Sequence, residues 1–136
     1  MNMKVAIISL NILIFLPFFL TWITAYYRKK QLGTINNNHP RAQYAQLQGV
    51  GERLVAAQLN TWEAIVFYMA SIMAVYLAGV DPEYTVIPCI AFVVCRVLFI
   101  AAYVANQAVL RSLIFIAGAM CCFYMFYMAY SPQFYS

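Results

Sequence analysis

Long apolar runs alternate with short polar connections along this chain. The runs cover residues 5–27, 54–79, 85–105 and 112–130. Each comes close to or exceeds the roughly 20 residues that a helix needs to cross a hydrocarbon core. Strands of a membrane barrel would instead alternate apolar and polar side chains over about ten residues. The pattern therefore predicts an all-α integral membrane protein, a bundle of four transmembrane helices in one domain over residues 1–136.

The connection between the first two runs is the longest polar part of the chain. Residues 33–40, "GTINNNHP", are rich in turn-forming side chains. A polar helical segment should follow and continue into the second run, although Gly49 and Gly51 each weaken that join by about 1 kcal/mol. The predicted helices are therefore about 5–27, 41–79 with a cytoplasmic extension, 85–105 and 112–130.

Composition agrees with a membrane protein. Of the 136 residues, 65% are hydrophobic and 9% are charged, and the mean hydropathy is +0.77. A soluble domain of this length could not cover its surface with so few polar side chains. The net charge of +4 is spread along the chain rather than gathered on one face, so no nucleic-acid surface is predicted.

The first run could alternatively be a cleaved signal peptide with Lys4 as its charged start. It is longer than a usual signal core, and it ends in Arg28-Lys29-Lys30 without a small-x-small cleavage pattern. We therefore interpret it as a helix of the bundle.

The distribution of basic residues predicts the topology. The connection at 81–84 carries none, whereas basic residues flank the other two connections. By the positive-inside rule, those two connections are cytoplasmic and both termini lie on the non-cytoplasmic side. The residues concerned are Arg28, Lys29, Lys30 and Arg41 in the first connection and Arg111 in the third.

The cysteines favour neither a metal site nor a disulfide framework. Cys89, Cys95, Cys121 and Cys122 lie inside apolar runs without a C-x-x-C pair, and His39 is the only histidine. We expect small buried hydrophobic side chains and no metal. A channel is also disfavoured, because no helix presents the repeated polar stripe of a pore lining.

Two charged residues lie deep within the predicted helices. An ionisable side chain near mid-membrane costs about 2.5–3.5 kcal/mol even on gentle insertion scales, so it should face the bundle and find a partner. Glu63 and Arg96 both fall roughly 13 Å below the cytoplasmic boundary at 1.5 Å per residue. Because their helices are sequential and antiparallel, we expect these two residues to form a buried pair.

Further polar residues lie between this pair and the boundary. Arg53 and Asn60 are seven residues apart and share a helix face with Glu63. Tyr103 repeats that spacing on the third helix, and Arg111 stands at the start of the fourth. The pattern predicts a polar pocket that opens at the cytoplasmic boundary and has the charged pair at its floor.

Each of these residues also has a purely structural explanation. Arg53 and Arg111 could extend into lipid headgroups, and Asn60 could join helices through a hydrogen bond. As a set, however, they suit an anion that carries an amine, such as a small peptide thiol. Arginines bind carboxylates bidentately, and a cation beside a thiol favours the thiolate that attacks.

The same residues resemble the signature of the MAPEG family, the membrane-associated proteins in eicosanoid and glutathione metabolism. "ERLVAAQLNTWEA" at 52–64 is similar to the family's E-R-x-x-x-A-x-x-N-x-x-E pattern. "CRVLFIAAY" at 95–103 is similar to its R-x-x-x-x-x-x-Y pattern, and "LRS" at 110–112 to the Arg-Ser pair that opens its last helix. The segment 39–64 looks most like the small bacterial members, and the resemblance covers nearly the whole chain.

The resemblance implies a homotrimer, here in a bacterial inner membrane, with glutathione as co-substrate between neighbouring subunits at the cytoplasmic side. It also implies a glutathione-dependent transferase, peroxidase or isomerase. Arg111 matches the arginine that stabilises the thiolate in the family, and Ser112 stands beside it as a second thiolate partner.

The other carried-over positions concern binding. Asn60, Glu63 and Tyr103 match positions that contact glutathione in the characterised enzymes, whereas Arg53 and Arg96 match arginines at the site and at its structural floor.

Two functions follow from these observations. The first is a glutathione-dependent transferase or peroxidase that acts on lipophilic electrophiles partitioning into the bilayer. The second is a non-catalytic accessory protein that binds lipid or a partner and retains the family fold. Ala56, Gln58 and Leu59 stand where the eukaryotic enzymes carry further basic residues, and each lost charge-assisted bond is worth roughly 1.5–3 kcal/mol.

Overall fold

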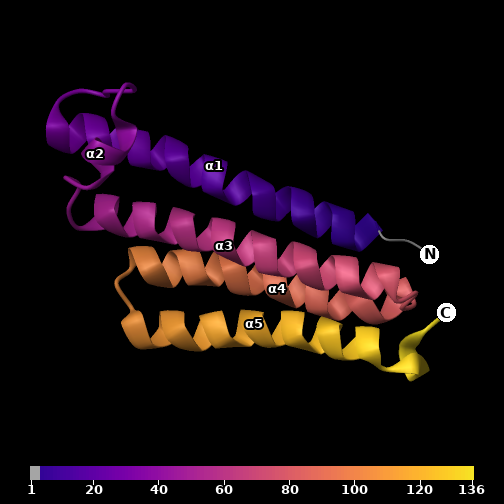
Figure 1. Ribbon diagram of the computed structural model, residues 1–136. Coiled ribbons are helices and arrows are strands. Elements are labelled where there is room, and N and C mark those ends of the chain that lie inside the picture. Colours follow the sequence, from indigo (N-terminus) through magenta and orange to yellow (C-terminus); the bar gives the residue numbers. More distant parts are fainter. Residues whose placement is uncertain (1–3) are drawn as a thin grey trace.

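The computed structural model describes residues 4–136, and it confirms the all-α class (Figure 1). Four long helices lie side by side. A short helix precedes the second of them, and a 3₁₀ turn follows the last. Within residues 4–136 the one β-type pairing is an isolated antiparallel bridge between Val80 and Tyr135. The elements are α1 (Lys4–Leu32), α2 (Pro40–Tyr44), α3 (Val50–Leu77), α4 (Pro82–Val104), α5 (Ala108–Tyr130) and η1 (Pro132–Phe134).

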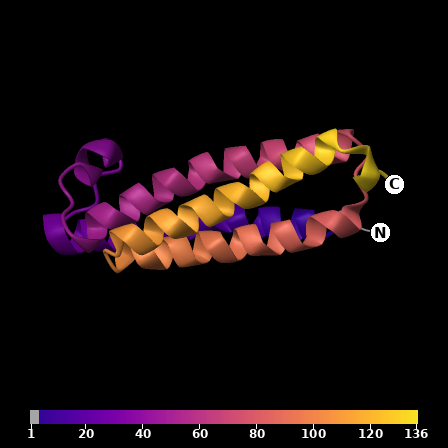
Figure 2. The same cartoon turned by 90° about the horizontal axis from the view of Figure 1, so that it is seen from below.

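The long helices run alternately up and down, so the bundle has two different ends (Figures 1 and 2). The α2 end contains α2, the rest of the α1–α3 connection and the α4–α5 turn. The terminal end contains the α3–α4 turn and both chain ends. α3 and α4 form the centre of the bundle, because each packs against all three other long helices.

The prediction of a single helix over 41–79 is wrong, because the structure divides this segment into α2 and α3. The chain leaves α2 through a turn in which Gln46 N donates to Gln43 O at 3.1 Å. It then reaches Gly49 with φ +60° and ψ −121°. Only glycine adopts such a conformation without strain, so the helix restarts after it, with Arg53 N donating to Gly49 O at 3.1 Å.

Three helices, α1, α4 and α5, are long and apolar enough to cross a membrane. α3 has 28 residues and lies alongside them in the bundle, but its composition differs. Its first half carries several strongly polar or charged side chains, among them Glu52, Arg53, Gln58, Asn60 and Glu63. The chain therefore has membrane-type helices around a more polar central helix.

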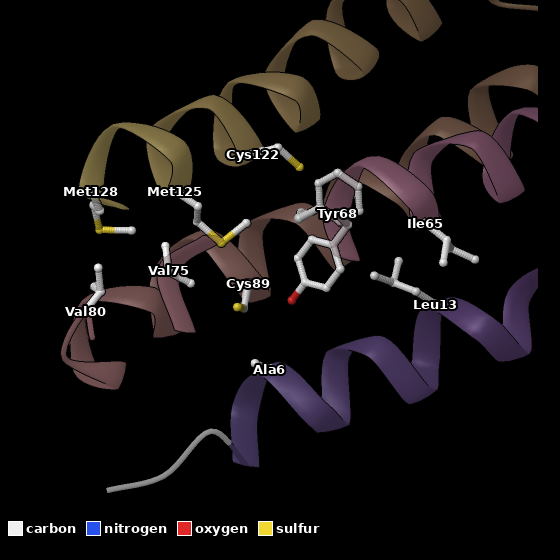
Figure 3. Packing of buried hydrophobic residues seen from close by; sticks show 11 residues of the cluster. Ala6, Leu13, Ile65, Tyr68, Val75, Val80, Cys89, Cys122, Met125 and Met128 are labelled. Carbon is white, nitrogen blue, oxygen red and sulfur yellow. The ribbon is translucent and has the colours of Figure 1, made fainter. Parts of the chain in front are cut away.

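The main cluster of the hydrophobic core lies in the terminal half of the bundle, and a smaller cluster around Leu20, Leu54 and Ala57 lies in the α2 half. Figure 3 shows Tyr68 in the middle of the main cluster, with its hydroxyl directed toward the start of α1. Its ring stacks on Phe92 at a centroid distance of 4.6 Å, and its hydroxyl hydrogen-bonds with Ser9 Oγ. Cys89 and Cys122 are buried in the same cluster. These contacts tie α1, α3, α4 and α5 together.

A polar cluster that the sequence analysis missed holds the α1–α3 connection. Arg28 near the end of α1 is 4% exposed. Its Nε donates to Gln43 Oε1 at 2.8 Å, and its Nη2 donates to Asn36 O at 2.7 Å. Gln43 in turn donates to Thr34 O at 3.1 Å, and the guanidinium lies 5.3 Å from the ring centroid of Tyr44. We call this cluster the Arg28 clamp.

Candidate functional site

Arg96 is the buried cation at the centre of the α2 half. It lies on the helix face of α4 that turns toward α3, and it is 3% exposed. Its Nη2 donates to Asn60 Oδ1 at 2.9 Å and, at a longer 3.4 Å, to Thr61 Oγ1. Its Nε is buried and has no hydrogen-bond partner in the described chain. Most buried polar groups are satisfied, so this atom marks an incomplete site.

The predicted direct pair between Glu63 and Arg96 is wrong. Among residues 4–136 the two side chains form no ion pair, and Glu63 is exposed rather than buried. Asn60 stands between them: its Oδ1 accepts from Arg96, and its Nδ2 donates to Glu63 Oε2 at 3.4 Å. Asn60 precedes Glu63 by three residues on α3, so both share one face, and the amide occupies the position nearer to α4.

A pocket of about 310 Å³ opens beside this trio, and we call it the inner pocket. Asn60, Glu63 and Arg96 supply its polar edge. Its remaining walls are apolar, formed by Ala64 and Phe67 of α3, Phe92 of α4, and Phe115, Gly118, Ala119 and Phe123 of α5. The volume lies within the roughly 300–1,000 Å³ of small-molecule sites.

The tight turn between α4 and α5 brings two further predicted residues together. Asn106 adopts a left-handed conformation with φ +58°, which asparagine tolerates better than most residues. Asn106 N donates to Tyr103 O at 3.1 Å and Gln107 N to Ala102 O at 2.9 Å, the pairing that closes a helix C-terminus. Because the chain reverses within three residues, the guanidinium of Arg111 lies 4.3 Å from the ring centroid of Tyr103.

Tyr103 and Arg111 line a second pocket of about 380 Å³, which we call the outer pocket. It adjoins the inner pocket, because Asn60 and Phe115 line both. The remaining lining residues are Phe99, Ser112 and Ile116. The structure therefore brings Asn60, Tyr103, Arg111 and Ser112 to one pocket, nearer the α2 end.

Two aromatic rings lie between two arginine side chains beside the pockets. The guanidinium of Arg96 lies 4.2 Å from the ring centroid of Phe99. Phe99 and Tyr103 pack edge to face at 5.5 Å, and Arg111 covers the other end. Each cation–ring contact of this kind contributes about 0.5–2 kcal/mol. These contacts hold the Arg96 guanidinium at the inner pocket and the Arg111 guanidinium at the outer pocket.

Arg53 lies apart from the two pockets. Its Nε donates to Val104 O at 3.1 Å, one of the last carbonyl groups of α4. Arg53 and Asn60 were predicted to share a helix face and to line one pocket. Arg53 does not line the pocket with Asn60, because its long side chain reaches the end of the neighbouring helix. Gln58 is also engaged elsewhere, since its Nε2 donates to Thr21 Oγ1 of α1 at 2.6 Å.

The aromatic walls were missed by the sequence analysis. Phe99 was detectable, because its spacing from Arg96 and Tyr103 places all three on one face of α4. Phe115 and Phe123 stand in α5, a helix that is apolar over most of its length, and the sequence analysis did not single them out. The arrangement offers fixed cations and an amide along a groove whose other walls are aromatic. It can bind an anionic group beside an apolar one.

Comparison with known proteins gives one match. The family model described as the MAPEG family matches residues 6–131, which include every residue of both pockets. No curated protein and no solved structure matches the chain.

Proposed function

The chain belongs to the MAPEG family, and from this premise we propose that it is a glutathione-dependent transferase or peroxidase that acts on lipophilic electrophiles. We place it in a bacterial inner membrane as a homotrimer, with α3 as the fourth membrane-spanning helix and glutathione as co-substrate. The single observation that carries the proposal is the joined pair of pockets, with Arg111 at the outer one and the buried Arg96 at the inner one.

Sidedness follows from the charges at the two ends of the bundle. Basic residues gather toward the α2 end, whereas the α3–α4 turn has Asp81 and Glu83 and no basic residue. We therefore assign the α2 end to the cytoplasm and both termini to the opposite side. The outer pocket then faces the compartment that supplies glutathione, and the inner pocket lies at the depth of the acyl chains.

The side chains of the two pockets would have different roles in binding and catalysis. The Arg111 guanidinium, with the Ser112 hydroxyl beside it, would stabilise the glutathione thiolate, the form that attacks. Asn60, Glu63 and Tyr103 would hold the polar parts of the peptide, and the aromatic walls would hold the lipophilic partner. Bringing the two reactants together from water and lipid supplies a proximity effect. Arg53 would act at the end of α4 rather than on the ligand.

The test uses the purified chain, glutathione and a lipophilic aryl halide. In this reaction the thiolate sulfur forms a bond to the ring carbon, the carbon–halogen bond breaks and halide leaves. Arg111→Ala should lower turnover by about 10²-fold or more, the usual loss when a donor to a developing anion is removed. Arg41→Ala, which removes an exposed arginine of α2, serves as the matched control. Equal turnover of Arg111→Ala and the intact chain would remove Arg111 from the mechanism.

A non-catalytic accessory role is the second candidate, and one observation favours it. Ala56 and Leu59 offer no donors, and Gln58 is engaged by Thr21, so the outer pocket has fewer direct partners for carboxylates than the eukaryotic members. Titration with glutathione distinguishes the two roles. Thiolate absorbance and heat of binding at millimolar glutathione support the enzyme, and their absence supports the accessory protein.

A further inference from the structure

A separate pocket of about 570 Å³ lies at the terminal end, on the outer side of α4 and α5. Its rim carries Glu83, Tyr84 and Tyr124. Its lower part is apolar and is formed by Ile87, Pro88, Ala91, Met120 and Cys121. None of the residues proposed for glutathione takes part in it. We call it the rim pocket.

The helix α4 indicates where the rim pocket lies relative to a membrane. This helix is long and apolar enough to cross a membrane, so its first turn lies at a membrane boundary. Glu83 and Tyr84 belong to that turn, and tyrosine is typical of the headgroup level. Ile87, four residues further along, is 78% exposed and continues the pocket along the path of an acyl chain.

The charge in the rim pocket has one sign. Glu83 is its single charged lining residue, and no residue that lines it within the described chain is basic. The carboxylate of Glu83 forms no ion pair within residues 4–136, and it does not cap the helix, since Asp81 caps the start of α4 by accepting from Glu83 N at 2.9 Å. The nearest arginine along α4, Arg96, is about 20 Å away at 1.5 Å per residue.

The two tyrosine rings are held in place by the C-terminal segment. Phe134 packs edge to face against Tyr84 at 5.2 Å and against Tyr124 at 6.4 Å. Phe134 itself is anchored to the α3–α4 turn, since Asp81 N donates to its carbonyl oxygen at 2.8 Å. The tyrosines remain 49% and 46% exposed, so both rings are positioned yet accessible.

We propose that the rim pocket binds a phospholipid with an ammonium headgroup, such as phosphatidylethanolamine or phosphatidylcholine. The ammonium group would lie between the Glu83 carboxylate and the rings of Tyr84 and Tyr124, because carboxylates and aromatic faces together attract organic cations. The tyrosine hydroxyls can donate to the phosphate, and one acyl chain would occupy the groove at Ile87 and Met120. An anionic lipid without an amine would keep the contacts of its phosphate and acyl chain, but it would lose the attraction to Glu83 and meet the repulsion of that carboxylate instead.

The test is native mass spectrometry of the detergent-purified full chain with phosphatidylethanolamine, phosphatidylcholine or phosphatidylglycerol of identical acyl chains. The two ammonium lipids should remain bound, and phosphatidylglycerol should bind roughly tenfold more weakly, the value of one charge-assisted contact. Glu83→Gln should reduce the ammonium lipids to the level of phosphatidylglycerol. Glu52→Gln, which removes an exposed carboxylate at the other end of the bundle, should leave retention unchanged.

A second variant addresses the aromatic part. Phe134→Leu removes the ring that positions both tyrosines but keeps the carboxylate, so it should lower retention of the choline lipid more than that of the ethanolamine lipid, which can still hydrogen-bond to Glu83. Equal binding of all three lipids, or unchanged binding in Glu83→Gln, would overturn the proposal. Glutathione turnover should not change in Glu83→Gln, which keeps this test independent of the proposed enzyme activity.

Discussion

Arg28 and Arg96 are almost equally buried, at 4% and 3% exposure, but their surroundings differ. In the Arg28 clamp, both Nε and Nη2 donate to oxygens of the α1–α3 connection at 2.7–2.8 Å. Arg96 has one short hydrogen bond, to Asn60, and its Nε has none. Arg28 is enclosed by the chain that it holds, whereas Arg96 lines a pocket.

The difference separates a structural arginine from a binding arginine. A buried donor without a partner costs about 1–3 kcal/mol, and a chain that needed only stability could replace Arg96 with an apolar residue. Arg96 also lines the inner pocket, so we expect the cost to be offset when an anionic ligand binds beside its guanidinium. Burial alone therefore does not identify the site, but burial together with an unpartnered donor and adjacent space does.

The largest effect on stability should come from the clamp. Arg28→Met removes two charge-assisted hydrogen bonds, so we expect a loss of about 2–3 kcal/mol in the free energy of unfolding. Thermal unfolding in detergent, followed by circular dichroism, measures it. Lys29→Met, an exposed cation one residue later in α1, is the control and should unfold at the temperature of the intact chain. A clamp variant as stable as this control would contradict the structural role of Arg28.

The next effect should concern binding rather than stability. Asn60→Leu removes the amide that connects Arg96 with Glu63 and lines both pockets. We expect glutathione affinity to fall by roughly tenfold or more, about 1.4 kcal/mol, measured by isothermal titration calorimetry. Thr61→Val, which removes the longer 3.4 Å contact to Arg96 and the hydrogen bond from Thr61 Oγ1 to Ala57 O within α3, should bind nearly as the intact chain does. A reversed order of these two variants would show that Asn60 is only a packing residue.

The smallest effect should come from Gln58→Leu. Its Nε2 joins α3 to α1 through Thr21 Oγ1, and hydrogen bonds between membrane helices average about 0.6 kcal/mol. We expect a slight decrease in stability and unchanged glutathione binding. Gln58→Arg should also leave glutathione binding unchanged, because Gln58 faces Thr21 of α1 and lines neither pocket; tighter binding in this variant would contradict that assignment.

Much of the architecture could be predicted from sequence, because apolar runs of helix length and basic flanks have few other interpretations. The burial of Arg96 and the presence of Tyr103 and Arg111 in one pocket also followed from helix periodicity and a short connection. The partner of Arg96 could not be predicted in this way. Residues at similar depth on two helices contact one another or not depending on how each helix is rotated about its axis. Asn60 and Glu63 differ by less than one turn, and only side-chain packing decided between them.

The Arg28 clamp could not be predicted from the sequence pattern for a different reason. In the sequence, Arg28 is one of three basic residues at a helix end, and such a group commonly indicates the cytoplasmic side of a membrane helix. Its burial depends on the path of the α1–α3 connection, which brings Asn36 and Gln43 back over α1. That path depends in turn on the break at Gly49, where the predicted helix was continuous.

The most direct test of the central claim is glutathione titration of Arg96→Met beside Arg28→Met, at a temperature at which both variants remain folded. Calorimetry gives Kd, and thiolate absorbance reports the ionised thiol. The account predicts that Arg28→Met binds as the intact chain does. Arg96→Met should bind roughly 10- to 150-fold more weakly, the equivalent of one charge-assisted hydrogen bond. Equal affinity of Arg96→Met and the intact chain would contradict the assignment of the inner pocket as a ligand site.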